Sequence, residues 1–294
     1  MTTEICSWLA RESGALAVAV PMEEACRYLL PGQNVPKGST VIVAAIPYYC
    51  GDSDGTVAKY ARGRDYHRVL RMLFADAVAT CGLSDSQIAA YSDVSPFREV
   101  ALASAAGLGV IGENGLLLTE SYGSYVFLGE ICGDIPGPTT ALTEPSRCSG
   151  CGACHRACPT GGNGCLSELT QRRGALSAEE EALMRHYQTA WGCDRCQDVC
   201  PANFHAKQTK LPAFCEELVP YFDHAMLSGL SNHAVERLYA DRAFVWRGGA
   251  VVKRNAAILS SADGADDGRS CADGITRTTT DRTVERESKT PPTV

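Results

Sequence analysis

Apolar positions in residues 1–135 recur with helical spacing in some segments and with strand-like spacing in others. The strand-like segments are 16–21, 41–46, 116–119 and 125–131, and the helical ones are 3–11, 22–30, 58–81 and 97–106. Segment 41–46 is a continuous apolar run rich in β-branched residues, which is typical of a strand covered on both faces. Because helices alternate with strands, we expect an α/β (α+β) domain over residues 1–140.

Turn-forming and polar residues become frequent after residue 132. Residues 133–146 hold three prolines and two glycines, which predicts a linker. A helix is expected at 178–187, where Ser177 and Glu180 have capping-box spacing, and short helices are expected over 211–260. Residues 261–294 have too little apolar surface to form a core, so we expect a disordered tail. The expected parts are therefore 1–140, 141–210, 211–260 and 261–294.

The composition is that of a globular protein, with 45% hydrophobic and 21% charged residues. It excludes disorder throughout the chain and a collagen-like or coiled-coil architecture. No apolar run approaches the ~20 residues of a membrane helix, and the first residues do not resemble a secretion signal, so we expect a cytoplasmic protein without membrane contact. The net charge of -7 excludes a globally basic nucleic-acid binder but allows local basic patches.

The chain has fifteen cysteines, and eight of them lie between Cys148 and Cys200. The odd total and the missing signal argue against a disulfide framework. Seven of the eight form two motifs, Cys148-x2-Cys151-x2-Cys154-x3-Cys158-Pro159 and Cys193-x2-Cys196-x3-Cys200-Pro201. The spacing of these motifs, rather than the number of cysteines, indicates their chemistry.

The motifs predict iron-sulfur clusters. Thiolates separated by two residues each reach a different iron of a [4Fe-4S] cluster, and the cysteine before the proline crosses to the other cluster. Zinc is the alternative, but it prefers two separated Cys-x2-Cys pairs around one ion, which fits this pattern poorly. We therefore expect a bacterial two-[4Fe-4S] ferredoxin-like region at 141–210.

Two such clusters need one thiolate more than the seven that the motifs supply. Cys165, between the motifs, is the best candidate for the eighth ligand, and Cys215 is the second choice because it lies in an apolar helical stretch. With the crossover, the expected ligands of the first cluster are Cys148, Cys151, Cys154 and Cys200. Those of the second cluster are Cys158, Cys165, Cys193 and Cys196.

Residues 107–112 match the pattern G-x-G-x-x-G of dinucleotide-binding loops. Such a site requires a strand before the glycines and a helix after them, whereas here a helical pattern precedes them and strand-like residues follow. We therefore reject nicotinamide binding. The glycines instead permit a tight turn or the close approach of a bulky ligand.

Several segments resemble signatures of the epoxyqueuosine reductase family. They are residues 60–67, 93–96, 106–109, 123–130, 165–170 and 252–258, together with the double cysteine motif. The family's members are cobalamin-dependent enzymes that remove the epoxide oxygen of epoxyqueuosine in tRNA to give queuosine. The resemblance implies that residues 1–140 bind cobalamin and that two clusters, reduced by an external low-potential donor, pass electrons to its cobalt. It also places the family's extra cluster cysteine at Cys165.

Asp93 matches the family's general acid, which would protonate the oxygen released from the epoxide. From the residues alone, a turn or capping role is the simpler interpretation, because Asp93 closely precedes Pro96. The family role implies a raised pKa, caused by burial beside the corrinoid. The resemblance further implies corrinoid contacts at Asp93, Leu117, Leu128, Gln197 and Asp198, although core packing explains the leucines equally well.

Three groups of basic residues are candidates for binding the phosphates of tRNA. They are Lys59, Arg62, Arg64, Arg68 and Arg71, then Arg172 and Arg173, and then Arg242, Arg247, Lys253 and Arg254. Each is alternatively a solvated residue or a partner in an intramolecular ion pair, for example with Asp65 or Asp241.

The chain differs from the family pattern in three ways. Glu113 stands where the family usually has lysine, the gap from Cys158 to Cys165 is short, and a polar tail takes the place of the family's C-terminal helical repeats. Two alternatives to the epoxyqueuosine reaction therefore remain. One is a corrinoid-dependent reductase of another substrate, and the other is an electron-transfer protein that uses the two clusters alone.

Overall fold

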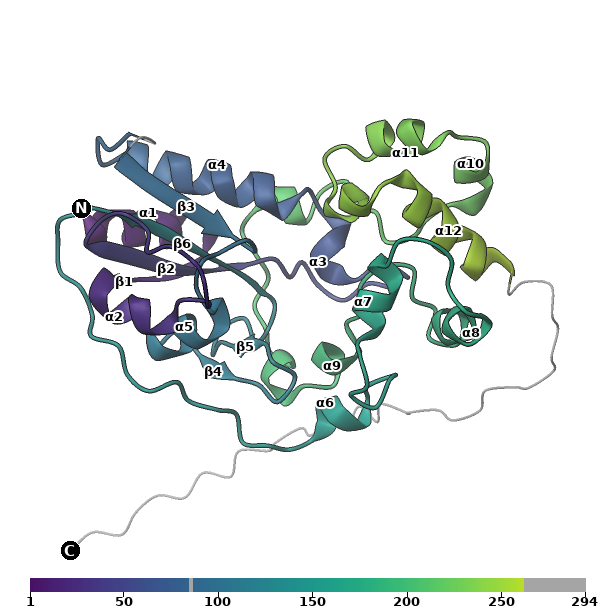
Figure 1. The fold of residues 1–294 in the computed structure, drawn as a ribbon, viewed down its shortest axis with the longest axis horizontal. Helices are drawn as coiled ribbons and strands as arrows, with labels where there is room; N and C mark the ends of the chain where they lie inside the picture. Colours follow the sequence, from purple (N-terminus) through teal and green to yellow (C-terminus); the bar gives the residue numbers. More distant parts are fainter. Residues whose placement is uncertain (85–86, 262–294) are drawn as a thin grey trace, which may run out of the picture. The chain divides into compact units, whose positions relative to one another are not determined.

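A four-stranded antiparallel sheet organises the N-terminal half of the chain in the computed structural model, which describes residues 1–84 and 87–261 (Figure 1). The strands follow the order β1 (Leu16–Pro21), β2 (Thr40–Pro47), β6 (Val126–Gly133) and β3 (Ile88–Ser92). Every neighbouring pair is antiparallel.

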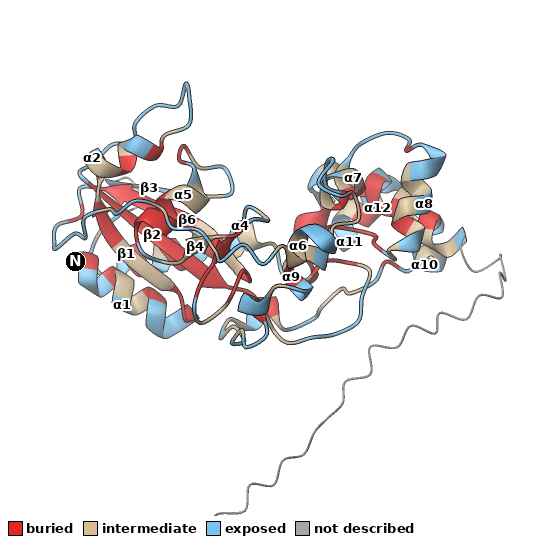
Figure 2. Cartoon of the chain, turned by 90° about the horizontal axis from the view of Figure 1, so that it is seen from below, coloured by how far each residue is buried: buried red, intermediate tan, exposed pale blue. Residues whose placement is uncertain are grey.

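Strand β2 is buried along its whole length because apolar cores lie on both faces of the sheet (Figure 2). Ile42, Ala44 and Ile46 face a core shared with α1 (Thr2–Ser13) and α4 (Tyr66–Ala79). The alternate residues of β2 face a second core. The helical elements on that side are α2 (Met22–Ala25), η1 (Cys26–Tyr28) and α5 (Glu99–Ala105).

A two-stranded ribbon follows α5 and consists of β4 (Val110–Ile111) and β5 (Leu117–Leu118). A helix thus precedes the glycines of residues 107–112 and a strand follows them, which confirms the inverted order that excluded a dinucleotide loop. Gly107 adopts a φ of 80°, a conformation that favours glycine, at the end of α5.

The remaining described elements are short helices. In chain order they are α6 (Ala153–Arg156), α7 (Leu166–Gln171), α8 (Ala178–His186), α9 (Arg195–Asp198), η3 (Pro201–Asn203), η4 (Pro212–Phe214), α10 (His224–Ser228), α11 (Asn232–Leu238), η5 (Ala243–Arg247) and α12 (Gly249–Ser260). Trp191, Phe244 and Val252 lie in one apolar core among them. The buried Asn255 of α12 donates to the carbonyls of Thr170 and Ala190, at 2.7 Å each, and so joins α12 to α7 and to the chain before the second cysteine motif.

Most expected elements are confirmed. The strand at 16–21 has the expected bounds, and α8 begins with the complete capping box of Ser177 and Glu180. The helix expected at 22–30 is shorter and becomes the 3-10 segment η1. No helix among residues 1–84 and 87–261 is long and apolar enough to cross a membrane. Apart from Ser261, the tail expected to be disordered at 261–294 lies outside the described residues.

The single helix expected at 58–81 is wrong. The chain instead forms α3 (Lys59–Arg62) and α4, separated by the extended Gly63. A Cβ at Gly63 would lie 2.8 Å from the Cα of Phe214, so the break lets η4 pack against this point. Asp65 then starts α4 as its N-cap by accepting a hydrogen bond from the backbone N–H of His67 at 3.1 Å.

Candidate active site beside the cysteine motifs

Four cysteines from both motifs line one small cavity of about 100 Å³. They are Cys148, Cys151, Cys154 and Cys200, the set expected for the first cluster. Cys154 lies on α6, and Cys200 immediately precedes η3. Four thiols around one cavity are the donor set that a [4Fe-4S] cluster requires.

Three of the cysteines expected at the second cluster are also close to one another. The pKa of Cys193 and that of Cys196 are each raised to about 11. Burial is the main cause, and the nearby Cys165 thiolate charge contributes to both increases. Cys165 is exposed and lies at the N-cap of α7. The charge of Cys154 also raises the pKa of Cys196, so the two sets of cysteines are neighbours.

Cys158 lies in a different environment. Its sulfur is 3.3 Å from the hydroxyl of Thr160, and this contact together with backbone N–H groups of Thr160, Gly161 and Gly162 lowers the pKa of the thiol. Converging N–H groups stabilise a thiolate, which is the form that binds iron. Cys215, the second choice for the eighth ligand, lies instead beside Cys50, whose thiol donates to the carbonyl of Phe214 at 3.1 Å.

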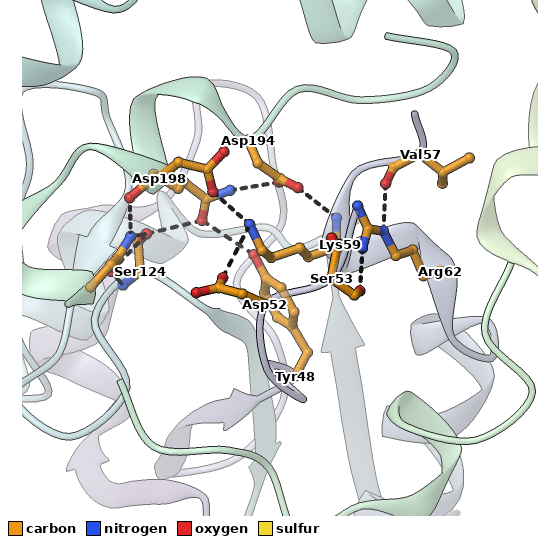
Figure 3. Close-up of polar contacts among 11 residues, drawn as sticks. Tyr48, Asp52, Ser53, Val57, Lys59, Arg62, Ser124, Asp194 and Asp198 are labelled. Carbon is orange, nitrogen blue, oxygen red and sulfur yellow. Dashed lines mark hydrogen bonds and ion pairs between the residues drawn. The ribbon is translucent and has the colours of Figure 1, made fainter. Parts of the chain in front are cut away.

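The second cysteine motif is fastened to the sheet by a buried polar network, drawn in Figure 3. The Gln197 side-chain oxygen accepts hydrogen bonds from the Tyr48 hydroxyl at 3.2 Å and from the Ser124 hydroxyl at 2.9 Å. Tyr48 directly follows β2, and Ser124 precedes β6. The side-chain amide of Gln197 therefore links α9 to one end of the sheet.

Lys59 fastens the same loop from the other side (Figure 3). Its ammonium lies 2.5 Å from Asp198, and its backbone N–H donates to Asp194 at 2.7 Å. Burial raises the pKa of Asp194, and the Lys59 charge opposes that increase. Asp198 thus has a partner within the chain, and Lys59, only 12% exposed, is no surface contact for phosphate.

Other basic residues proposed for tRNA are likewise engaged within the protein. Arg62 is 6% exposed and donates to the carbonyls of Val57 and Ser53 at 2.6 and 2.8 Å. Arg64 pairs with Glu217 at 3.0 Å. Further partners are Asp241 for Arg64, Glu180 for Arg172, the Glu217 carbonyl for Arg242, the Leu230 carbonyl for Lys253, and the Arg172 and Gly174 carbonyls for Arg254. The break at Gly63 also separates the five basic residues that were assigned to one helix.

Asp93 leaves the sheet at the end to which the cluster loop is fastened. Ser92 is opposite Gly129 in the β3–β6 pair, so Asp93 lies one residue further, toward Leu128. Its backbone has a φ of 64°, which is uncommon for a residue other than glycine, and its side chain is 59% exposed. Its carboxylate lies 3.3 Å from Nε2 of His67.

The raised pKa expected for Asp93 is wrong for this structure. The hydrogen bond from His67 is the largest influence and lowers the pKa of Asp93, outweighing the desolvation that would raise it. The expectation assumed burial without a cationic neighbour. Because the partner is 26 positions away in the sequence, no local pattern indicated it.

Leu117 and Leu128, the two leucines expected to contact the corrinoid, differ in how deeply they are buried. Leu117 is 2% exposed and packs inside the core between the sheet and α5, which favours the core-packing alternative. Leu128 is only partly buried and lies on β6 near the end from which Asp93 emerges. The structure therefore brings Asp93, Leu128 and Gln197 to one end of the sheet, while Leu117 lies on the separate ribbon.

Two acids near this site, one buried and one partly buried, were missed by the sequence analysis. Glu130 on β6 is fully buried, and burial raises its pKa to about 8. Glu99 at the start of α5 has its pKa raised to about 7, mainly by burial and then by Asp93. The sequence gives no sign of their burial beyond the position of Glu130 within an apolar strand.

Two family models match the chain. The model described as "Epoxyqueuosine reductase QueG, DUF1730" matches residues 29–93, and that of the "4Fe-4S dicluster domain" matches residues 147–204. The first range ends at Asp93, and the second contains all eight cysteines of the expected cluster sites. The class is thus a protein with a dicluster iron-sulfur domain.

Curated relatives agree. The epoxyqueuosine reductase of Listeria monocytogenes is 36% identical over 228 residues, which are 71% of this chain and 58% of the relative. That of Synechocystis is 36% identical over 220 residues, which are 67% of this chain and 73% of the relative. The chain belongs to the epoxyqueuosine reductase family. It spans less than two thirds of the length of the Listeria relative.

Solved structures agree on the fold. The epoxyqueuosine reductase from Streptococcus thermophilus superposes with a TM-score of 0.72 at 22% identity, over 88% of this chain and 80% of that one. An epoxyqueuosine reductase crystallised with an epoxyqueuosine-modified stem loop of tyrosine tRNA gives a TM-score of 0.67 at 25% identity, over 83% of this chain and 76% of that one.

Proposed function

We propose that this chain reduces epoxyqueuosine in tRNA to queuosine, using cobalamin and two [4Fe-4S] clusters. The observation that carries the proposal is the end of the sheet where Asp93 emerges, because the loop of the second cysteine motif is fastened to that same end. An acid and an electron source would thereby meet in one place, as reductive removal of an epoxide oxygen requires. The relative solved with a modified tRNA stem loop supports the substrate.

For the clusters, we propose the two crossed ligand sets. Cys148, Cys151, Cys154 and Cys200 would hold the first, which their shared cavity supports. Cys158, Cys165, Cys193 and Cys196 would hold the second, which the mutual influence of Cys165, Cys193 and Cys196 supports. An external low-potential donor would reduce them.

The residues at the end of the sheet also fit a corrinoid. Leu128 is partly exposed, and Val94, next to Asp93, is 80% exposed, so apolar surface lies open beside a carboxylate. Such a mixture of apolar surface with a few polar groups suits a large ring with polar substituents. When bound, cobalamin supplies a strongly reducing cobalt centre. Gln197 and Asp198 would adjoin it through the cluster loop.

Asp93 is proposed as the catalytic acid. Cleavage of the epoxide leaves an oxygen that takes up a proton, and Asp93 would donate that proton from its carboxyl group. The polar network around Gln197 and Lys59 would keep the cluster loop in place and exclude water from it. The proposed organisation is a catalytic part at 1–140, a cluster part at 141–210 and a helical part at 211–260, in a cytoplasmic enzyme.

The test begins with protein purified without oxygen in the presence of cobalamin. We expect about eight irons per chain and one bound corrinoid. Nucleosides of tRNA from a strain lacking this protein should accumulate epoxyqueuosine, and the restored wild-type chain should convert it to queuosine. Asp93→Asn should retain the irons and the corrinoid but lose conversion. A chain without corrinoid would instead be an electron-transfer protein, and unchanged queuosine in the deletion strain would refute the substrate.

A further inference from the structure

His67 lies between two carboxylates. Its Nδ1 is 2.8 Å from Oδ1 of Asp65, and its Nε2 is 3.3 Å from Oδ2 of Asp93. Ionised carboxylates only accept hydrogen bonds, and a neutral imidazole has a single N–H. Both contacts are therefore satisfied at once only when His67 is a protonated imidazolium.

The fold holds the His67 ring in this position. Asp65 caps α4 by accepting the backbone N–H of His67, so the group that orients the ring is fixed by the start of the helix. The ring stacks on Tyr66 with the centroids 4.0 Å apart. Tyr66 in turn stacks on Phe127 of β6 at 4.2 Å, almost in parallel. The imidazole is thus connected to the sheet through Tyr66 and Phe127.

The charges around the His67 ring, taken together, favour its protonated form. The N-terminus of α4 disfavours a cation, but two carboxylates in direct contact outweigh a partial charge. The hydrogen bonds to Asp65 and then to Asp93 are the largest causes that raise the pKa of His67 to about 9, against desolvation. The titratable and charged groups that face the pair are Tyr60, Asp65, Tyr66, Arg68, Asp93 and Glu99.

We propose that His67, oriented by Asp65, is the proton store of the site and holds Asp93 in its left-handed backbone conformation. This inference rests on the proposed function. Asp93 is the catalytic residue because it would touch the substrate, and His67 is a positioning residue that acts through it.

The proton balance explains why a store is needed. Removing an epoxide oxygen as water consumes two electrons and two protons: both C–O bonds break, a double bond forms between the two carbons, and two O–H bonds form. The electrons come from the clusters and their external donor. Asp93, whose pKa is lowered, is an anion at neutral pH and has no proton of its own to give. The N–H bond of His67 breaks as the Asp93 carboxyl gains the proton, Asp93 then protonates the oxygen, and the second proton comes from solvent.

Asp65→Asn isolates the charge of the orienting residue. Asparagine caps helices as well as aspartate does, and its oxygen still accepts from His67, so the geometry remains and the negative charge is lost. The first measurement is an NMR titration of the histidine ring protons in the full chain with its clusters, with the His67 signals assigned by His67→Gln. We expect His67 to titrate near pH 9 in the wild type. Asp65→Asn and Asp93→Asn should each lower that pKa by about one unit or more.

The second measurement is the pH profile of epoxyqueuosine conversion. Turnover should fall as the pH rises through the pKa of His67, and in Asp65→Asn this fall should begin at a lower pH by the same shift that NMR records. His67→Gln should retain its irons and circular dichroism but lose about 100-fold or more in turnover. His233→Gln removes the histidine of another carboxylate pair, His233 with Glu236, and should leave the profile unchanged.

The two failures are distinguishable. If the wild type converts no epoxyqueuosine at any pH, the proposed function fails, whereas the NMR titration still decides whether His67 is protonated. If the wild type is active but His67 titrates near its ordinary value of 6.5, the proton store is refuted. An unmoved pH profile in Asp65→Asn would refute it as well.

Discussion

Asn203 is the point at which a single substitution should separate the cluster loop from the sheet. Its side chain is buried, and its oxygen accepts the backbone N–H of Ser124 at 2.7 Å. Its amide donates to the carbonyl of Gln197 at 2.8 Å and to the Ser124 hydroxyl at 2.9 Å. One side chain therefore links η3, which follows the second motif, both to α9 and to the turn before β6.

Asn203→Ala removes all these bonds and leaves partners behind. The N–H of Ser124 becomes a buried group without its hydrogen bond, which costs about 1–3 kcal/mol, whereas the carbonyl of Gln197 loses one bond but still accepts the N–H of Cys200. We expect the free energy of unfolding to fall by about 2–4 kcal/mol in total, with the lower end applying if water enters the space. Because the loop carries Cys193, Cys196 and Cys200, cluster release should accelerate along with unfolding.

The assay is urea unfolding of anaerobically reconstituted protein, followed by circular dichroism and by the visible absorbance of the clusters. Asn163→Ala is the matched control, since Asn163 is exposed between the motifs and its side chain makes no hydrogen bond within the described residues. The control should change the free energy of unfolding by less than about 0.5 kcal/mol. A change of that small size in Asn203→Ala would refute the role given to the network.

Three further outcomes are expected. Cys165→Ser should reduce the iron content from about eight to about four per chain, whereas Cys215→Ser should retain it, as an iron assay would reveal. Glu130 has a folded-state pKa of about 8 against an ordinary 4.5, so the free energy of unfolding should fall as the pH rises between these values. Glu130→Gln should reduce this dependence in urea titrations at pH 5 and pH 8, leaving the part that comes from Glu99 and His67. Lys59→Met should cost about 1–3 kcal/mol by leaving Asp194 and Asp198 without their cation, and Lys207→Met, at an exposed lysine, should be neutral in the same titration.

The sequence predicted best the segments whose structure is decided locally. Strand β2 could be predicted because its apolar, β-branched residues are buried on both faces. Helix α8 could be predicted because its capping residues, Ser177 and Glu180, lie at the start of the helix itself. In both cases the signal and the structural feature occupy the same short stretch. The grouping of Cys148, Cys151 and Cys154 with Cys200 around one cavity agrees with the crossed spacing, and the two cluster ligand sets stay a prediction.

The failures have the opposite cause. Strand β3 was missed because Ile88–Ser92 is only partly buried and is rich in alanine, so that its pairing with β6 defines it rather than its own residues. The break between α3 and α4 depends on η4, which packs against Gly63 from about 150 positions away in the chain. Lys59 was assigned to a basic surface because its partner Asp198 belongs to the second motif. These are tertiary contacts, which leave no local trace.

The register of β3 on β6 determines where the acid lies. Successive side chains of a strand point to opposite faces, so a slip of one residue between Ser92 and Gly129 would turn Asp93 away from His67. Gly129 itself restricts such a slip, because a Cβ there would lie 2.7 Å from the Tyr91 carbonyl oxygen and 2.8 Å from the Phe74 ring. The close packing of β3 and α4 at this glycine brings the strand that ends just before Asp93 next to the helix whose first turn contains His67. The contact between His67 and Asp93 is therefore a consequence of sheet packing, and the position of Asp93 depends on Gly129 and Phe74, which lie behind it in the fold.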